Sequence, residues 1–374
     1  MPPAAANPQL AASVVRDTWR VTTLAEVGGW PAVLRRLLAG EDLTGAEAAA
    51  ALGDVLAGEA SPAQIAGFVV ALRAKGETVE ELTGMVGAML AAAEAFELPA
   101  GVDAVDTCGT GGSAPRREAA FNVSTVAALV AAGAGAVVCK HGGRAATATS
   151  SSADVLGALG VAFELGPEGV GRCVAEAGMG FCFAPRFHPA MRHAAPVRRE
   201  LGVPTVFNLL GPLSNPAHVR RQVLGVADVG VAEKVAGVLA ARGATRALVV
   251  HGADGLDELT TCDASDVLQV EGGTITRYRV TPEDVGLRRA SPADLRGGDP
   301  SANAAIARRV LAGEPGAHRD LAVLNAAAAL VAGGRADDVA AGVAAAQQSI
   351  DTGAAAGVLD RLVAASQSAA ADSA

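Results

Sequence analysis

Two glycine-rich loops, each directly after a short apolar run, most constrain the fold of this chain. The run at 102–105 leads into CGTGG at 108–112, and the run at 136–139 leads into KHGGR at 140–144. Between them, NVST at 122–125 opens a segment rich in alanine and valine. The order is strand, glycine loop, helix, strand and basic glycine loop. In such a unit the loops gather at the carboxyl ends of the strands, where open α/β sheets bind ligands.

The residue types in these loops favour an anionic ligand. Glycine lets backbone N–H groups approach phosphate oxygens closely. Asn122, Ser124 and Thr125 lie where a helix begins, so their side chains can cap that helix or donate to an oxyanion. Lys140 is one of only three lysines in the chain and adds a compact positive charge. A tight turn with ordinary capping is the alternative for one loop, whereas the pair of loops favours a phosphate site.

The chain as a whole predicts an α/β protein with two lobes. Residues 28–98 carry apolar side chains at helical spacing and helix-start signals at Thr44, Ser61 and Thr78. From residue 102 onward, strands and helices alternate, which is typical of a largely parallel sheet. With 374 residues the chain exceeds one typical core. We therefore expect an N-terminal helical lobe hinged to a larger α/β lobe with a mainly parallel central sheet.

The expected boundaries follow from local composition. The Ala- and Pro-rich residues 1–20 and the last residues, 366–374, are expected to be disordered. A hinge at LPAG separates a helical domain, 21–99, from an α/β domain, 100–365. A basic helix at about 188–202 is expected to join the helical domain. Three finer expectations are one continuous helix at 190–201, a strand near 161–164 and a small β element at 264–280.

Charge and cysteine content exclude several classes of protein. A net charge of −9 argues against a general nucleic-acid binder, so any anion site must be local. The five scattered cysteines form no CxxC pair and suit a reducing cytoplasm, and Cys139 and Cys182 are expected to be buried thiols. Residues 1–17 lack the pattern of a signal peptide, and the longest apolar run, 126–139, is too short to span a bilayer. We expect a cytoplasmic protein without a membrane partner.

Asp257 and Glu258 follow another predicted strand, in a glycine-rich loop. Adjacent carboxylates are hard oxygen ligands that suit Mg²⁺ bridging to phosphates. An exposed acidic turn is the alternative. The Mg²⁺ interpretation gains support because this loop is expected at the same sheet edge as the glycine loops. Fixed donors, a lysine and Mg²⁺ together can stabilise a pyrophosphate leaving group.

Arg198 lies on the predicted basic helix, close in sequence to an apolar turn at 207–212. A buried arginine can bind a carboxylate through two parallel hydrogen bonds, while a solvated helix face is the alternative. The neighbouring Arg192 and Arg199 are expected to be solvated. His141, next to Lys140, either contacts a substrate or fixes its loop. His188, which precedes a proline, is expected to be a structural turn residue.

These motifs resemble the anthranilate phosphoribosyltransferase family, class IV phosphoribosyltransferases related in fold to pyrimidine nucleoside phosphorylases. The resemblance covers about 28–360 and rests on six segments in order, namely GTGG at 109–112, NVST at 122–125, KHG at 140–142, SAD at 152–154, the run at 181–217, and HG at 251–252 through DGLDEL. It implies the two-lobed fold and a homodimer formed through the helical domain. It also implies transfer of 5-phosphoribose from phosphoribosyl pyrophosphate (PRPP) to the amino group of anthranilate, with release of pyrophosphate, in tryptophan biosynthesis.

The resemblance also implies a role for each matching position, with the α/β domain binding PRPP. The PRPP-binding set is Gly109, Thr110, Gly111, Gly112, Asn122, Ser124, Thr125, Lys140 and Thr147. The acceptor-binding set is Arg198, His141, Gly143 and Pro185, and the Mg²⁺ set is Ser124, Asp257 and Glu258. No side chain acts as a strong general base in this family. Positioning and stabilisation of the leaving group then carry the rate.

Three departures from the family pattern keep other functions open. Ser113-Ala114 stands where the family has Asp-Gly, the loop is longer at 115–118, and Gly143 replaces an asparagine. Arg116 and Arg117 either compensate by contacting phosphate or belong to a solvated loop. A paralogue that uses a different aromatic acceptor in specialised metabolism is the first alternative, favoured by the space at Gly143. A non-catalytic phosphate-binding paralogue is the second, and the retained phosphate and metal residues argue against it.

Overall fold

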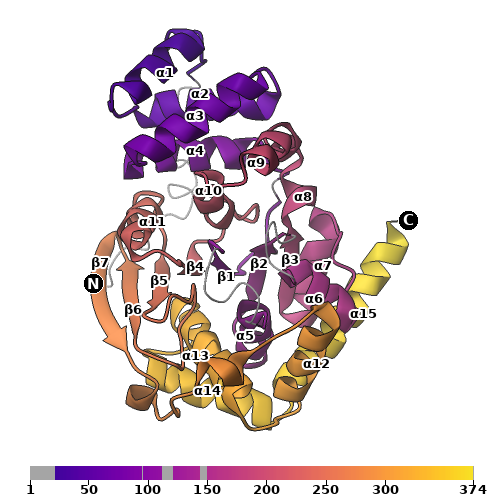
Figure 1. The fold of residues 1–374 in the computed structure, drawn as a ribbon. Coiled ribbons are helices and arrows are strands. Elements are labelled where there is room, and N and C mark those ends of the chain that lie inside the picture. The colour runs from indigo at the N-terminus through magenta and orange to yellow at the C-terminus, as the bar shows by residue number, and fades with distance from the viewer. Residues whose placement is uncertain (1–21, 95, 112–120, 144–149, 374) are drawn as a thin grey trace, which may run out of the picture.

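From residue 22 onward, four helices of the described chain precede the first strand and form the helical lobe seen at the top of Figure 1. The computed structural model describes residues 22–94, 96–111, 121–143 and 150–373. The four helices are α1 (Gly29–Leu38), α2 (Gly45–Ala57), α3 (Pro62–Lys75) and α4 (Val79–Ala91). Capping boxes at Thr44, Ser61 and Thr78 begin the last three, which confirms the helix-start signals. Local sequence chemistry therefore determines where these helices begin.

A seven-stranded sheet forms the centre of the α/β lobe, in the order β3-β2-β1-β4-β5-β6-β7. Its strands are β1 (Val105–Gly109), β2 (Val138–Gly142), β3 (Met179–Phe183), β4 (Arg221–Gly225), β5 (Arg246–Gly252), β6 (Ser265–Glu271) and β7 (Thr274–Val280). The pairs among β1 to β5 are parallel and the last two pairs are antiparallel, which confirms a mainly parallel sheet. The strand order reverses beside β1, between β2 and β4. Such a reversal opens a crevice at the carboxyl ends of the strands.

Helices cover both faces of this sheet (Figure 1). They are α5 (Val123–Gly133), α6 (Ser152–Leu159), α7 (Pro167–Ala177), α8 (Ala184–Phe187), α9 (Ala195–Leu201), α10 (Phe207–Leu213), α11 (Val229–Ala241), α12 (Pro300–Leu311), α13 (Ala317–Ala332), α14 (Val339–Asp351) and α15 (Ala354–Asp372). Short 3₁₀ helices span Pro189–His193 (η3), Glu283–Val285 (η4) and Pro292–Leu295 (η5). None of the helices in the described ranges is long and apolar enough to cross a bilayer.

Two hydrophobic cores lie on opposite faces of the sheet. One contains α5, the C-terminal helices and β1 to β3, with Val130, Val138 and Leu324 fully or almost fully buried. The other joins the helical lobe to α9, α10, α11 and one face of β4 to β6, so that Phe68 and Val249 belong to the same cluster. Residues of the predicted basic helix, such as Val197, pack in this second core. We therefore propose a domain boundary near residue 99. We also assign the later segment 188–202 to the helical domain, because it packs in the same core.

Three local predictions are wrong. Residues 161–166 form no strand; instead the Ala162 N–H donates to Ser366 Oγ at 3.1 Å, and the segment packs on α15. The helix expected at 190–201 divides into η3 and α9, because Pro196 lies in the first turn of α9 and cannot continue the preceding helix. The tail expected to be disordered at 366–374 is helical as far as Asp372, since alanine-rich segments favour helix. The expectation of disorder at 1–20 lies outside the described residues.

Candidate active site

A cleft of about 1060 Å³ opens at the carboxyl ends of the strands, between the sheet and the segment 195–211. Of the site residues expected from the sequence, it is lined by Gly109, Thr110, Gly111, Asn122, Ser124, Lys140, His141, Gly143, Arg198, Asp257 and Glu258. Gly112 and Thr147 lie outside the described residues, as do Ser113, Ala114 and the loop extension at 115–118. The structure thus brings together parts of the chain up to 149 positions apart.

Two of the expected residues do not line this cleft. Thr125 is fully buried in the first turn of α5, and its hydroxyl has no hydrogen-bond partner within the described structure. Pro185 is exposed at the start of α8 and is absent from the cleft wall formed by the described residues. A role for either residue in ligand binding remains a prediction.

The acidic loop, defined as residues 253–264, lies against the first glycine loop. The Gly111 N–H donates to Asp257 Oδ2 at 3.0 Å, and the Ser124 N–H donates to Glu258 Oε1 at 3.1 Å. A Cβ at Gly225 would lie 1.6 Å from the Asp257 carbonyl oxygen, and a Cβ at Gly109 would lie 2.7 Å from Asp257 Oδ2. Only glycine permits this approach, so the glycines of β1 and β4 bring the two carboxylates to the cleft.

Lys140 is buried beneath the cleft floor, with 2% of its surface exposed. Its ammonium donates to the Thr107 carbonyl oxygen and, at 3.1 Å, to Ser124 Oγ. Burial lowers the pKa of Lys140 and raises that of the neighbouring Asp106, while the attraction between the two charges opposes both shifts. The Lys140 ammonium therefore contacts the first turn of α5, and the charge of Asp106 balances its own.

Asp106 ties the two central strands together, and sequence reasoning did not identify it. Its Oδ1 accepts the His141 N–H at 2.9 Å, and its Oδ2 accepts Asn215 Nδ2 at 3.0 Å and Gln222 Nε2 at 3.3 Å. The sequence does place this aspartate inside a strand expected to be buried. A buried charge needs hydrogen-bond or ionic partners, and this requirement could have identified Asp106. The network fixes the backbone of the second glycine loop directly behind the cleft.

His141 is a buried neutral imidazole. Its ring lies 5.1 Å from the ring of His188, and its Nε2 has no hydrogen-bond partner within the described structure. Burial is the main cause that lowers the pKa of His141 to about 3. His188 is also buried, with Nε2 2.9 Å from the Ser214 carbonyl oxygen, in agreement with a structural role. A strong general base at His141 is excluded by this environment.

Arg198 forms the opposite wall of the cleft. Its guanidinium lies 5.2 Å from the centre of the Phe207 ring, and no carboxylate of the described chain forms an ion pair with it. Burial lowers its pKa, yet a guanidinium remains protonated. Arg192 and Arg199 are exposed, as expected, although Arg199 also lines the cleft. A half-buried cation over an aromatic ring suits a planar aromatic carboxylate.

Gly143 lies on the same wall as His141. A Cβ at this position would be 3.5 Å from Ala184 Cβ, which is an ordinary van der Waals contact, and its φ is outside the left-handed region. Among the described residues, none therefore requires glycine here. The missing side chain leaves space at the cleft wall.

The donors at the acidic loop fit Mg²⁺. Asp257, Glu258 and the Ser124 hydroxyl are hard oxygen groups on one wall of the cleft. The described residues contain no group of three or more His, Cys, Asp or Glu that could hold a metal alone. Mg²⁺ commonly binds through one or two carboxylates and completes its shell with water and substrate phosphates. The residues present suit a cation that arrives with a phosphate ligand.

Comparison with known proteins supports a family assignment. Residues 31–93 match the helical bundle domain of the glycosyl transferase family, and residues 101–356 match its a/b domain. Anthranilate phosphoribosyltransferase from Salinispora arenicola is 51% identical over 341 residues, which cover 89% of this chain and 96% of the relative. This similarity extends over both lobes.

Solved structures give the same result. The crystal structure of anthranilate phosphoribosyltransferase from Thermus thermophilus has a TM-score of 0.84 and 45% identity, and the match covers 90% of this chain and 99% of that one. The Saccharomyces cerevisiae enzyme in complex with PRPP and Mg has a TM-score of 0.83 and 28% identity, with 91% and 98% covered. The same yeast enzyme is also similar in its complex with 4-fluoroanthranilate. The chain belongs to the anthranilate phosphoribosyltransferase family of transferases.

Proposed function

We propose that this protein transfers 5-phosphoribose from PRPP to the amino group of anthranilate and releases pyrophosphate, a step of tryptophan biosynthesis. The observation that carries the proposal is one cleft that joins an anion-binding wall to Arg198. Gly109 to Gly111, Ser124 and Lys140 form the first wall, and Arg198 over Phe207 forms the second. The yeast relative binds PRPP and Mg, and also 4-fluoroanthranilate, in its solved structures. These two ligands have the chemistry that the two walls suit.

At the first wall, fixed donors and charges hold the pyrophosphate end of PRPP. The Asn122 side-chain amide and the Lys140 ammonium provide hydrogen-bond donors and one positive charge. The Gly109–Gly111 backbone borders them, with the Thr110 and Gly111 N–H groups already bonded to Gly225 and Asp257. Asp257, Glu258 and Ser124 would hold Mg²⁺, which neutralises charge on the leaving pyrophosphate when it is bound. Because these groups are already held in place, little reorganisation is needed as the negative charge develops.

At the second wall, Arg198 holds the acceptor carboxylate and orients the ring. The lone pair of the neutral aryl amine attacks the anomeric carbon, a C–N bond forms, and the C–O bond to pyrophosphate breaks. The amine then loses one proton to the released pyrophosphate or to water. His141 has a pKa of about 3 and is too weakly basic to drive this proton transfer. Positioning of the two substrates is therefore the main contribution of the chain.

Fluorescence tests the activity directly. When purified protein is mixed with anthranilate, PRPP and Mg²⁺, the fluorescence of anthranilate should decrease as it is converted, at a rate proportional to enzyme concentration. Omission of Mg²⁺ should suppress that rate. Absence of turnover with PRPP still bound, as measured by calorimetry, would exclude anthranilate as the acceptor. Absence of both turnover and PRPP binding would leave a non-catalytic protein.

Transfer to a different aromatic carboxylate is the second candidate function. The space that the described residues leave at Gly143, on the cleft wall, favours a larger acceptor. Competition among substituted anthranilates distinguishes the two. A higher kcat/KM for a ring-substituted acid than for anthranilate would favour the alternative, and introduction of Gly143→Asn should then reverse the preference.

We also propose a cytoplasmic homodimer formed through the helical lobe. Leu38 on α1 and Val70 on α3 are 79% and 47% exposed, which leaves apolar surface on this lobe. Light scattering during gel filtration should give twice the mass of 37.0 kDa. Leu38→Glu with Val70→Glu should shift the protein toward the monomer, and an unchanged dimer would place the interface elsewhere.

A further inference from the structure

Two buried asparagines on the C-terminal helices form hydrogen bonds to segments that carry cleft residues. Asn325 on α13 is 5% exposed and Asn303 on α12 is 1% exposed. These helices lie at the end of the molecule opposite α1–α4 (Figure 1). A buried amide is costly unless its hydrogen bonds are made. Both asparagines make bonds outside their own helices, to loops of the cleft wall.

Asn325 holds the acidic loop by its backbone. Its Oδ1 accepts the Leu259 N–H at 3.0 Å, and its Nδ2 donates to the Leu259 carbonyl oxygen at 2.9 Å and to the Leu321 carbonyl oxygen at 3.0 Å. Leu259 directly follows Glu258 and is fully buried. The amide thus fixes both polar groups of a backbone unit next to the two carboxylates. Rotation of that unit would move Glu258 away from the Ser124 N–H.

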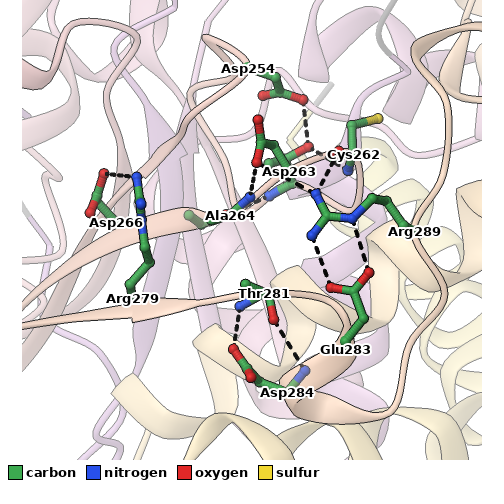
Figure 2. A network of polar contacts seen from close by, with 12 residues as sticks. Asp254, Cys262, Asp263, Ala264, Asp266, Arg279, Thr281, Glu283, Asp284 and Arg289 are labelled. Atoms are coloured by element: carbon green, nitrogen blue, oxygen red, sulfur yellow. Dashed lines mark hydrogen bonds and ion pairs between the residues drawn. The ribbon is translucent and has the colours of Figure 1, made fainter.

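Other hydrogen bonds fix the two ends of the acidic loop. Thr260 Oγ1 donates to Asp254 Oδ2 at 2.6 Å, and the Thr260 N–H donates to Ser265 Oγ at 2.9 Å. Figure 2 shows Arg289 between Glu283 and the 262–263 backbone, which it contacts through the Cys262 carbonyl oxygen at 3.2 Å. These bonds close the ends of the loop. In the middle of the loop, beside the carboxylates, Asn325 adds two hydrogen bonds from α13 to the Leu259 backbone.

Asn303 contacts the same wall of the cleft at Asn122, just before α5. Its Nδ2 donates to Asn122 Oδ1 at 3.0 Å, and its Oδ1 accepts the Gly298 N–H at 2.8 Å. Asn122 Oδ1 also accepts Ser150 Oγ at 3.0 Å, and Asn122 Nδ2 donates to the Ser150 carbonyl oxygen at 3.3 Å. Asn122 precedes α5 but makes no side-chain capping bond. Its amide orientation is therefore set by Asn303 and Ser150.

We propose that Asn325 and Asn303 are positioning residues of this active site. Asn325 holds Asp257 and Glu258 in position to bind Mg²⁺, and Asn303 holds Asn122 so that its side-chain amide nitrogen can donate to a phosphate oxygen of PRPP. The inference rests on the proposed function. Neither residue lines the cleft, and each acts by keeping a ligand-binding group in place before the ligand arrives.

The test compares Asn325→Asp and Asn303→Asp, which keep side-chain volume, with the wild-type chain. Mn²⁺ replaces Mg²⁺ so that metal binding is measured by electron paramagnetic resonance in the presence of PRPP, and PRPP binding is measured by calorimetry without metal. Asn325→Asp should raise the Mn²⁺ dissociation constant about 10- to 100-fold, as is usual for groups that orient metal ligands, and leave PRPP binding without metal nearly unchanged. Asn303→Asp should raise the PRPP dissociation constant roughly 5- to 10-fold, as expected for one misplaced hydrogen bond.

The matched control is Ser349→Ala. Ser349 on α14 donates to the Val130 carbonyl oxygen at 2.8 Å, at the end of α5 away from the cleft. This variant also loses a buried bond between a C-terminal helix and the α/β core, so it should lower the unfolding temperature and leave both dissociation constants at wild-type values. A merely structural role for the asparagines would make all three variants behave alike.

Two results separate failure of this inference from failure of the proposed function. Wild-type protein that binds neither PRPP nor Mn²⁺ with PRPP contradicts the proposed function. Wild-type binding together with unchanged binding in both folded Asp variants overturns the inference alone. Should an Asp variant fail to fold, Asn325→Leu and Asn303→Leu take its place, and hydrogen exchange of the wild-type Leu259 amide provides a further check. Exchange of that amide as fast as in an unprotected chain would also overturn the role of Asn325.

Discussion

The Lys140 ammonium reaches Ser124 Oγ across 3.1 Å, from the second glycine loop to the first turn of α5. This contact joins the end of β2 to α5 through a buried charge whose counter-charge is Asp106. The same lysine balances a buried charge of the fold and, in the proposed function, supplies positive charge to the phosphate ligand, and the two effects can be measured separately.

Lys140→Met should lower the free energy of unfolding by roughly 3–5 kcal/mol, because Asp106 then remains as a buried charge without its partner. It should also weaken PRPP binding at least about tenfold. Adding Asp106→Asn should restore much of the stability but not PRPP affinity. Urea unfolding and calorimetry measure the two quantities. Full recovery of PRPP binding in the double variant would remove Lys140 from the phosphate site.

Arg198→Met should raise KM for anthranilate about 10- to 100-fold, since a charge-assisted bond to the carboxylate is lost. PRPP affinity should stay within about twofold of the wild-type value, because Arg198 lies on the other wall of the cleft. Steady-state kinetics and calorimetry test both statements. Arg192→Met, on the exposed side of η3, is the control and should change neither. An equal effect of both substitutions would argue for a general charge effect.

Gly225→Ala should reduce kcat/KM by at least about 100-fold, because the added methyl group would lie 1.6 Å from the Asp257 carbonyl oxygen and must displace the acidic loop. Gly171→Ala on α7 is the control, since a Cβ there has no atom within 4 Å. That control should be as active as the wild type and up to about 1 kcal/mol more stable. A fully active Gly225→Ala protein would show that the carboxylates tolerate movement.

Acid should destabilise the fold partly through His141. Burial lowers the pKa of His141 from 6.5 to about 3, so below pH 6.5 the unfolded chain binds a proton that the folded chain does not. The free energy of unfolding therefore falls as the pH decreases from about 6.5 toward 3. His141→Gln removes this contribution, and its unfolding temperature should fall less steeply between pH 7 and pH 5 than that of the wild type. His193→Gln, a histidine outside the cleft wall, serves as the comparison. Parallel curves for wild type and His141→Gln would contradict a buried neutral His141.

The parts of the fold that depend on short-range chemistry were predictable. Thr44, Ser61 and Thr78 mark helix starts with residues only three positions away, and the glycine loops follow their apolar runs directly. Their gathering at one sheet edge followed from parallel strand topology. Most residues expected at the site, Lys140 and Asp257 among them, do line one cleft.

The missed features depend on distant partners. Asn303 meets Asn122 across 181 positions and Asn325 meets Leu259 across 66, and neither contact has a local pattern. The strand expected near 161–164 failed for a related reason. The Ala162 N–H bonds Ser366 of α15, 204 positions away, and the Phe163 ring packs on Phe183 of β3, so the segment does not pair within the sheet. Burial patterns alone do not distinguish a strand from an extended segment that packs on a helix.

The hydrophobic core shared by the helical lobe and the β4–β6 face has a consequence for how the molecule unfolds. Phe68 of α3 and Val249 of β5 belong to one cluster, and a Cβ at Gly237 of α11 would lie 2.8 Å from Val79 Cγ2 of α4. Detachment of the helical lobe would expose apolar surface on both partners at once. The two lobes are therefore one cooperative unit, and calorimetry should record a single heat-absorption peak rather than two.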